Sequence, residues 1–253
     1  SAAEPEALKR DLPCLKPTEP ADALATFTVK SDFRIELSAA EPFVTDPVAM
    51  AFDENSRLFV VEMIGYSEHR DDRLGQVRLL EDENGDGRYD RSTIYAGDLA
   101  WPTAIVCHDG GVFIGATPDI LFLKDTDGDQ KADERRVIFT GIGDGVNRLN
   151  MQSLMNSFRW GHDNRIHGTA SGTPGKVRVV GKPERGTVTF RRGDFSFDPR
   201  VLDFRLESGG AQHGMDFDAA GRKFVCSNSH HIQQVMYERR YARVNPNFSP
   251  PSP

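Results

Sequence analysis

The chain has 253 residues, of which 38% are hydrophobic and 27% are charged, and its formal net charge is −7. This length suffices for a large domain with a substantial core, and the acidic balance argues against nucleic acid or an anionic membrane as a partner. No segment approaches the roughly 18 consecutive apolar residues of a membrane-spanning helix, so the sequence predicts no transmembrane segment in this chain.

The first 25 residues are rich in Ala, Pro and Glu and contain no hydrophobic signal-peptide core. We interpret residues 1–25 as an N-terminal linker, of the kind that begins a mature exported protein, which predicts a periplasmic or extracellular location. Residues 26–253 are predicted to form one β domain that belongs to a longer chain. The stretch "TFTVKSDFRIELSAAEP" (26–42) is expected to supply strands before the first repeat.

Four later segments share one pattern, in which a turn containing Asp or Gly precedes a short apolar strand. They are "FDENSRLFVVEM" (52–63), "CHDGGVFIGAT" (107–117), "WGHDNRIHGTA" (160–170) and "FDAAGRKFVCSNS" (217–229). Alignment of the turns brings one apolar residue of each strand into register, at spacings of 54, 54 and 58 residues. These residues are Leu58, Val112, Ile166 and Phe224. We expect each segment to be an inner strand of its own four-stranded sheet.

Two acidic loops lie between successive copies of this pattern. In "EDENGDGRYD" (81–90) the oxygen-bearing residues are Asp82, Asn84, Asp86 and Asp90, and in "KDTDGDQKAD" (124–133) they are Asp125, Asp127, Asp129 and Asp133. Side-chain oxygens at positions 1, 3 and 5 of a tight turn converge on one centre, which predicts structural Ca²⁺ sites. Position 12 holds Thr93 or Arg136, so neither loop is an EF-hand, and both resemble the calcium loops of dockerin and thrombospondin type. The alternative is a solvated turn without metal.

Several short strands per unit, at a period of roughly 40 to 55 residues, are typical of a β-propeller. The sequence therefore predicts an all-β fold with about four blades and part of another, in a ring that is incomplete. A β-sandwich is the alternative, but it does not explain why one loop chemistry recurs at one spacing.

Two further elements are expected in the second half of the chain. Residues 176–192 predict a hairpin with "GKPERG" at its tip, because hydrophobic and polar residues alternate on both sides of this turn. A helix is predicted only over 231–244, where Ile232, Val235 and Met236 fall on one face.

Long stretches of this sequence resemble the propeller domain of membrane-bound dehydrogenases of planctomycete and verrucomicrobial type. They are "DPVAMAFDENSRLFVVEM", "TPDILFLKDTDGDQKADERRVIFTG", "NSFRWGHDN" and "MDFDAAGRKFVCSNSHHIQQVMY". The resemblance covers about residues 32–253, and this family is distantly related to the soluble glucose and sorbosone dehydrogenases. It implies a pocket at the propeller axis, oxidation of a small sugar or alcohol, and a quinone cofactor, which is pyrroloquinoline quinone in the better-known relatives.

The resemblance also implies an electron-transfer partner. Longer family members continue into helical repeats and a c-type haem domain. This chain has no Cys-x-x-Cys-His motif, so the haem is expected elsewhere, in a longer chain or in a separate protein.

In the dehydrogenase relatives the general base is a histidine eight residues before the glycine of the Trp-Gly turn. That glycine is Gly161 here, so the position belongs to Ser153, which is no base near neutral pH without a partner. His213, in "ESGGAQHGMDF", is the substitute candidate, and Gln212 beside it is positioned to orient a substrate hydroxyl. Glu62 matches a glutamate that the family places near the axis.

Arg159 and Asn156 are the candidates for holding the quinone, since a guanidinium fork suits the carboxylates of such a cofactor. The first functional hypothesis is therefore an exported quinone-dependent sugar or alcohol dehydrogenase-like domain that passes electrons to a haem. The alternative is a non-catalytic, calcium-stabilised propeller that binds carbohydrate or protein at its loops. Ser153 favours this alternative, whereas the long resemblance favours the first.

Overall fold

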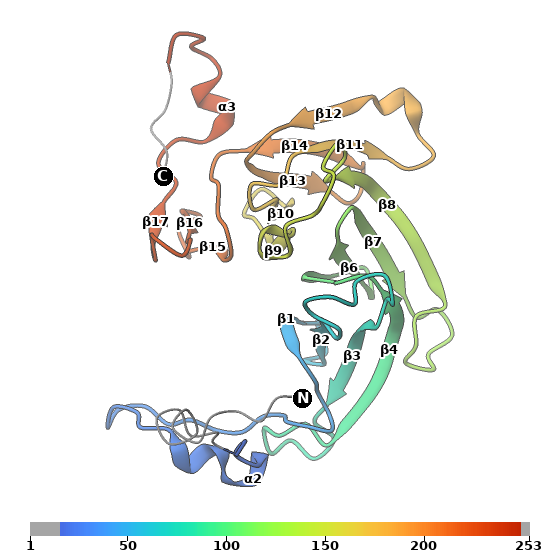
Figure 1. The fold of residues 1–253 in the computed structure, drawn as a ribbon, viewed down its shortest axis with the longest axis vertical. Helices are drawn as coiled ribbons and strands as arrows, with labels where there is room; N and C mark the ends of the chain where they lie inside the picture. Colours follow the sequence, from blue (N-terminus) through green and yellow to red (C-terminus); the bar gives the residue numbers. More distant parts are fainter. Residues whose placement is uncertain (1–15, 249–253) are drawn as a thin grey trace, which may run out of the picture.

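The computed structural model describes residues 16–248, and nearly all of its regular structure is β-strand (Figure 1). The described strands form four antiparallel sheets. The first sheet contains β1 (Pro47–Phe52), β2 (Leu58–Glu62), β3 (Gly75–Glu81) and β4 (Arg91–Leu99). The second contains β5 (Ala104–His108), β6 (Gly111–Ala116), β7 (Asp119–Lys124) and β8 (Glu134–Ile142), to which β11 (Gly175–Val179) and β12 (Thr187–Phe190) are added at the outer edge.

The third sheet contains β9 (Asn156–Trp160), β10 (Ile166–Thr169), β13 (Asp194–Asp198) and β14 (Asp203–Glu207). The fourth contains β15 (Met215–Phe217), β16 (Lys223–Val225) and β17 (Gln233–Gln234). The helices are short: α2 (Pro20–Ala23), α3 (Arg239–Ala242) and the 3₁₀ turns η1 (Leu24–Thr26), η2 (Met151–Ser153) and η3 (Pro183–Arg185). No helix in the described range has the length and apolar character required to span a membrane.

The sheets stand side by side around an open arc, with their first strands toward the interior and their last strands outside (Figure 1). The first strands also contact one another in succession, β1 with β5, β5 with β9, and β9 with β15. Antiparallel sheets stacked radially in this way form a β-propeller. The predicted fold class is therefore confirmed.

Alternation along the strands explains how each sheet joins its neighbours. In β6, Val112 and Ile114 belong to the hydrophobic cluster shared with the first sheet, whereas Phe113 belongs to the cluster shared with the third. Successive side chains of a strand point to opposite faces, and here both faces are covered. For this reason "GVFIGA" in β6 and "LFVV" in β2 are uninterrupted apolar runs, and every residue of both strands is buried, including Glu62 at the end of β2.

The four aligned residues lie in four different sheets, and each occupies the second strand of its sheet: Leu58 in β2, Val112 in β6, Ile166 in β10 and Phe224 in β16. The repeat is confirmed, and both acidic loops lie in the outer hairpins, β3–β4 and β7–β8. The expected strand number is wrong for two sheets, because the second has six strands and the fourth has three described strands. Each aligned turn joins the first strand of its sheet to the second. The innermost strand of each sheet is therefore the one before the aligned turn, and not the strand that holds the aligned residue.

The hairpin expected over 176–192 is present as β11 and β12, with Val177 and Phe190 buried. The helix predicted over 231–244 is wrong. Residues 233–234 instead pair with β16 as β17, because the open edge of that strand offers backbone hydrogen bonds, and only α3 follows. Ile232 and Met236, the expected apolar face, are 80% and 69% exposed.

The strands expected before the first repeat are not formed. Residues 27–46 contain no strand, so the strands predicted over 26–42 are absent, and the expected part of an additional blade is wrong. This segment packs through side chains such as Ala39 and Val44 without pairing as a strand. Of the predicted linker, residues 1–15 lie outside the described range.

Candidate functional site

The connections of the propeller divide between two edges of its sheets, because successive antiparallel strands run in opposite directions. One edge, named here the loop face, carries the connections 63–74, 100–103, 143–155 and 208–214. The opposite edge, named the turn face, carries both acidic hairpins. Ser153, Asn156, Gln212 and His213 therefore all lie at the loop face, as does the end of β2.

Ser153 lies in the η2 turn of the loop face. Its hydroxyl accepts a hydrogen bond from Asn150 Nδ2 at 3.2 Å, and its carbonyl accepts one from Thr173 Oγ1 at 2.5 Å. No described imidazole or carboxylate contacts the hydroxyl as a base would. The residue is therefore placed to hold the 143–155 connection rather than to take up a proton.

Glu62 is fully buried at the end of β2. Its Oε1 accepts a hydrogen bond from the Thr45 amide at 2.6 Å, and its Oε2 accepts one from Gln76 Nε2 at 2.5 Å and pairs with Arg78 Nε at 3.3 Å. Buried carboxylates are normally satisfied in this way. Both oxygens are thus engaged in holding the residue segment before β1 and strand β3 against β2.

His213 projects from a loop that is fixed to two sheets. Asn156, buried at the start of β9, donates from Nδ2 to the carbonyl of Gln212 at 2.8 Å. On the other side, the Gln212 amide donates to the Cys226 carbonyl at 3.0 Å, and Gln212 Oε1 accepts from the Asn228 amide at 3.2 Å. The backbone that presents His213 is therefore held between the third and fourth sheets.

The His213 side chain itself is exposed, and its ring makes no hydrogen bond within residues 16–248. Partial desolvation by the loop lowers the pKa of His213 below its ordinary value. Gly214 follows it with φ at 105°, and a Cβ on Gly214 would lie 2.5 Å from Cys226 Sγ. Glycine at this position therefore lets the loop approach the fourth sheet closely.

The predicted quinone ligands are engaged by the protein. Asn156 also donates to the Leu154 carbonyl at 3.0 Å and accepts from Ser157 Oγ at 2.7 Å. Arg159 lies three residues further along β9, away from the loop face, and pairs with Asp216 at 3.2 Å. Asn156 has no free group and Arg159 lies away from the loop face that carries His213, so the two do not form one quinone cradle.

Sequence reasoning missed an aromatic pair on the loop face. The rings of Tyr66 and Trp101 have centroids 6.2 Å apart; Tyr66 is 54% exposed, whereas Trp101 is buried. Trp101 shares a cluster with Leu154, whose carbonyl accepts the hydrogen bond from Asn156 described above. The pair is therefore linked to the loop that carries His213. Because Tyr66 and Trp101 are far apart in the sequence, they form no motif. The only signal in the sequence is one isolated Tyr and one isolated Trp, each in a loop.

The second acidic loop has the geometry of a cation site. One carboxylate oxygen from each of Asp125, Asp127 and Asp129 lies within 4.8 Å of the others, and no other cluster of three such groups exists within residues 16–248. Converging hard oxygens of this kind suit Ca²⁺. The fourth predicted ligand, Asp133, accepts from the Thr126 amide at 2.7 Å and closes the same hairpin.

In the first acidic loop, Asp82 accepts hydrogen bonds from the amides of Gly85 at 2.7 Å and Gly87 at 2.8 Å. The Asn84 side chain accepts one from the Asp86 amide, and the Asp90 carboxylate accepts one from the Glu83 amide. The turn is therefore shaped like its counterpart. Asn84 replaces one carboxylate, which lowers the negative charge available to a cation.

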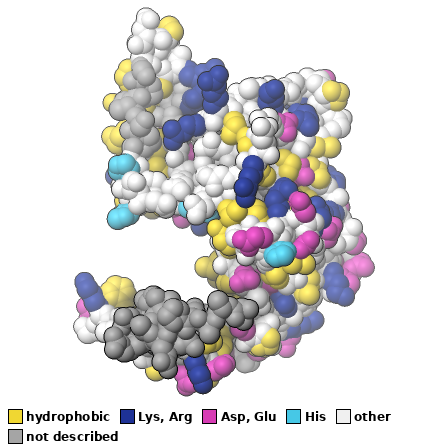
Figure 2. All heavy atoms as spheres, viewed as in Figure 1, with side chains coloured by type: hydrophobic (Ala, Val, Ile, Leu, Met, Phe, Trp, Pro, Cys, Tyr) yellow, Lys and Arg dark blue, Asp and Glu magenta, His cyan; other side chains and the backbone are white. Residues whose placement is uncertain are grey.

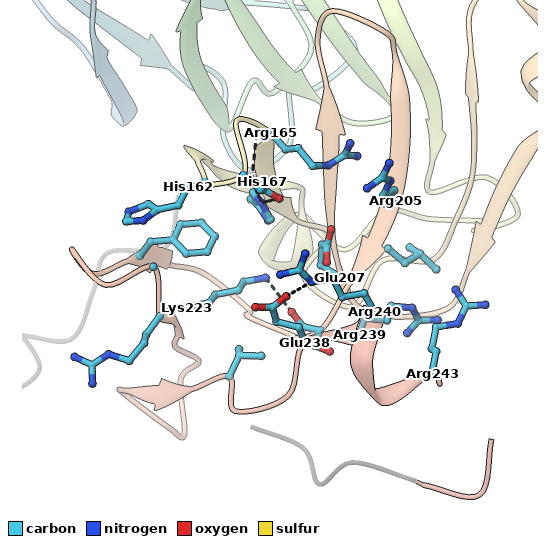
Figure 3. A pocket seen from close by; sticks show the side chains of 18 of the residues that line it. His162, Arg165, His167, Arg205, Glu207, Lys223, Glu238, Arg239, Arg240 and Arg243 are labelled. Carbon is cyan, nitrogen blue, oxygen red and sulfur yellow. Dashed lines mark hydrogen bonds and ion pairs between the residues drawn. The ribbon is translucent and has the colours of Figure 1, made fainter. Parts of the chain in front are cut away.

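A cavity of about 1000 Å³ lies apart from all of these residues, between β10 and β14 of the third sheet, β12, the fourth sheet and α3 (Figure 3). His162, His167, Arg205 and Lys223 are among its lining residues. None of the residues predicted from sequence as catalytic, cofactor-binding or metal-binding lines it.

A family model described as a domain of unknown function, DUF7133, matches residues 19–253. None of the curated proteins compared with this chain matches it.

Three solved structures are similar to this chain at low identity. The extracellular domain of a protein described as a one-component system from B. thetaiotaomicron has 10% identity and a TM-score of 0.39, and the match covers 76% of this chain and 24% of that one.

The second is a protein from Lactobacillus plantarum, with 11% identity, a TM-score of 0.40, and coverage of 75% of this chain and 70% of that one. The third is the periplasmic gluconolactonase of Pseudomonas aeruginosa, with 14% identity, a TM-score of 0.43, and coverage of 78% of this chain and 72% of that one. This chain thus spans about a quarter of the first of these structures.

Proposed function

We propose, for a chain that belongs to the DUF7133 family, that the loop face of this propeller binds a sugar or a similar polyhydroxylated ligand, as part of an exported domain. The observation that carries the proposal is the exposed ring of Tyr66 against Trp101, linked through Leu154 and Asn156 to the loop of Gln212 and His213. An aromatic ring covers the C–H face of a sugar, and neighbouring amide and imidazole groups bond its hydroxyls.

The experiment is a glycan array followed by calorimetry with the best ligand. Tyr66→Ala should weaken binding roughly tenfold or more, because the ligand loses an apolar surface of the size of a buried aromatic ring. Tyr66→Phe keeps the ring and should retain most of the affinity. Phe33, which is also exposed, supplies a matched control in Phe33→Ala. Equal affinity of Tyr66→Ala and wild type would contradict the proposal.

A second candidate function is quinone-dependent oxidation of the bound sugar or alcohol, with electrons passed to a haem protein. His213 favours it, since its lowered pKa keeps the exposed imidazole neutral and able to accept a hydroxyl proton near pH 7. The engagement of Arg159 and Asn156 argues against it. Dye reduction with added pyrroloquinoline quinone and a sugar panel tests this candidate. His213→Gln should lower the rate roughly 10²- to 10⁴-fold, the contribution of a general base.

Calcium belongs to the proposal as a structural cation in the acidic hairpins of the turn face. Asp125, Asp127 and Asp129 support this role through their converging oxygens. A cation there neutralises mutual repulsion and fixes the β7–β8 hairpin against the first sheet.

A further inference from the structure

The cavity beside α3 is strongly cationic. Six arginines and Lys223 line it against three carboxylates, those of Asp163, Glu207 and Glu238. Figure 2 shows Lys and Arg side chains gathered next to α3, and the close-up shows several of them around one hollow (Figure 3). A concave surface with an excess of one sign of charge concentrates ligands of the opposite sign.

Several of these cations are already paired. The pairs are Arg165 and Arg205 with Asp203, Arg222 with Asp218, Lys223 with Asp194, and Arg240 with Glu238. Two guanidinium groups remain. Arg239 has an Nε that is shielded from solvent and lacks a hydrogen-bond partner among the described residues. Arg243, at the C-cap of α3, has no ion pair with any described carboxylate.

A buried histidine adds a different requirement. His167 is 7% exposed and lines the cavity, and its Nε2 lies 3.1 Å from Asp163 Oδ1. Burial lowers the pKa of His167, against the opposing effect of Asp163, so the ring is neutral near pH 7. Because Nε2 donates its proton to the carboxylate, Nδ1 is an acceptor, and it has no partner within residues 16–248. A hydroxyl donor would satisfy it.

We propose that this cavity is a second binding site, separate from the loop face, for an acidic sugar, that is, a hydroxyl-bearing ligand with carboxylate or sulfate groups. The unpaired guanidinium groups of Arg239 and Arg243 hold the acidic groups, since planar forks match carboxylate and sulfate oxygens. His167 receives a hydroxyl. The volume of about 1000 Å³ exceeds that of a single small anion and suits an oligosaccharide. The ring of Phe217, against which His167 packs at 5.0 Å, supplies an apolar wall.

Calorimetry with the full chain tests the site, with four probes: oligogalacturonate for carboxylates, κ-carrageenan oligosaccharide for sulfates, neutral maltohexaose, and sodium sulfate. At least one acidic oligosaccharide should bind, more weakly as salt rises, and the affinities of the two identify the acidic group. The double variant Arg239→Glu, Arg243→Glu should weaken binding roughly ten- to a hundredfold, as expected for lost charge-assisted hydrogen bonds.

Arg192→Glu makes the same type of charge change at an exposed position outside the cavity and should leave affinity within a factor of about two. Tyr66→Ala should also leave it unchanged, which separates this site from the loop-face site. The proposal is overturned if neither acidic probe binds, if maltohexaose binds as well as they do, or if sodium sulfate accounts for all of the affinity. It is overturned equally if the double variant binds like wild type.

Discussion

The two acidic hairpins have nearly the same sequence, but they contact different kinds of neighbour. The hairpin of β7–β8 rests on the first sheet: the Ala132 amide donates to the Tyr95 carbonyl at 2.8 Å, and Gln130 Nε2 donates to Glu81 at 2.7 Å. The hairpin of β3–β4 has no preceding sheet in the described structure. There the Tyr89 amide, at the same loop position as Ala132, donates to the carbonyl of Ser38 at 2.9 Å.

This difference shows what the outer hairpin does in each repeat. It fastens its sheet to whatever precedes it, another sheet in one case and the irregular segment 38–44 in the other. That segment also covers the outer face of the first sheet, where Val44 and Ala39 pack with Leu58 and Leu80. Residues 38–44 therefore occupy the place of a preceding blade without forming a strand.

The largest expected effect is that of calcium on thermal stability. At a free concentration 100 times its Kd, a ligand stabilises the native state by about 2.7 kcal/mol, which for a domain of this size is a rise of roughly 5 to 11 °C in Tm. Asp129→Asn should remove the larger part of this rise and Asp86→Asn the smaller, because only the second loop brings three carboxylates together. Thermal melts with calcium and with excess chelator measure both.

These two variants are matched. Each aspartate accepts one bond at 2.8 Å from the amide two residues ahead, Lys131 or Arg88, and an asparagine oxygen can accept the same bond. The turn is thus kept while one negative charge is removed. An identical melt of the wild type in calcium and in chelator would exclude a structural cation, and a larger effect of Asp86→Asn would reverse the ranking of the loops.

A smaller effect is expected from Tyr95, which joins the second loop to the first sheet. Its buried hydroxyl accepts a bond from the Asp125 amide at 3.0 Å, and burial raises the pKa of Tyr95 to about 12, so it stays protonated. Tyr95→Phe leaves that amide unpaired and should lower the free energy of unfolding by about 1 to 3 kcal/mol.

The corresponding link of the first hairpin is the bond from Ser92 Oγ to the Phe43 carbonyl, 2.7 Å long and exposed. Water can replace it, so Ser92→Ala should cost only about 0.5 kcal/mol. Urea unfolding in chelator compares the two variants without a metal contribution. Equal losses would show that the sheet and segment 38–44 make equivalent partners for the hairpins.

Local patterns predicted the repeat, because each turn and the apolar strand that follows it are made of neighbouring residues in the sequence. They failed where a segment's structure depends on distant partners. Residues 233–234 became a strand because the edge of β16 was open. Asn156 proved to hold a loop 56 residues away, and the contacts of Tyr66 with Trp101 and of His167 with the α3 cavity arise only after folding.

The smallest expected effect is on stability at low pH, and it should be the same for the two acidic loops. Amide donors led by Gly87 lower the pKa of Asp82; partial burial raises that of Asp125, but the amides of Gly128 and Gln130 outweigh it, so its pKa is lowered as well. A depressed carboxyl pKa contributes stability that is complete above the unfolded value, about 3.9, and is lost as pH falls through the folded value.

In chelator, Tm should therefore be constant between about pH 7 and 5 and decline below about pH 4. Asp82→Asn and Asp125→Asn each remove one titrating group and should flatten this decline slightly and to the same extent, since both carboxylates are solvent-screened at the turn face. Melts of the three proteins across the pH range measure it. Because this acid response needs neither the metal nor the neighbouring sheet, a difference between the two variants would mean that the contacts with Tyr95 also govern how the second loop titrates.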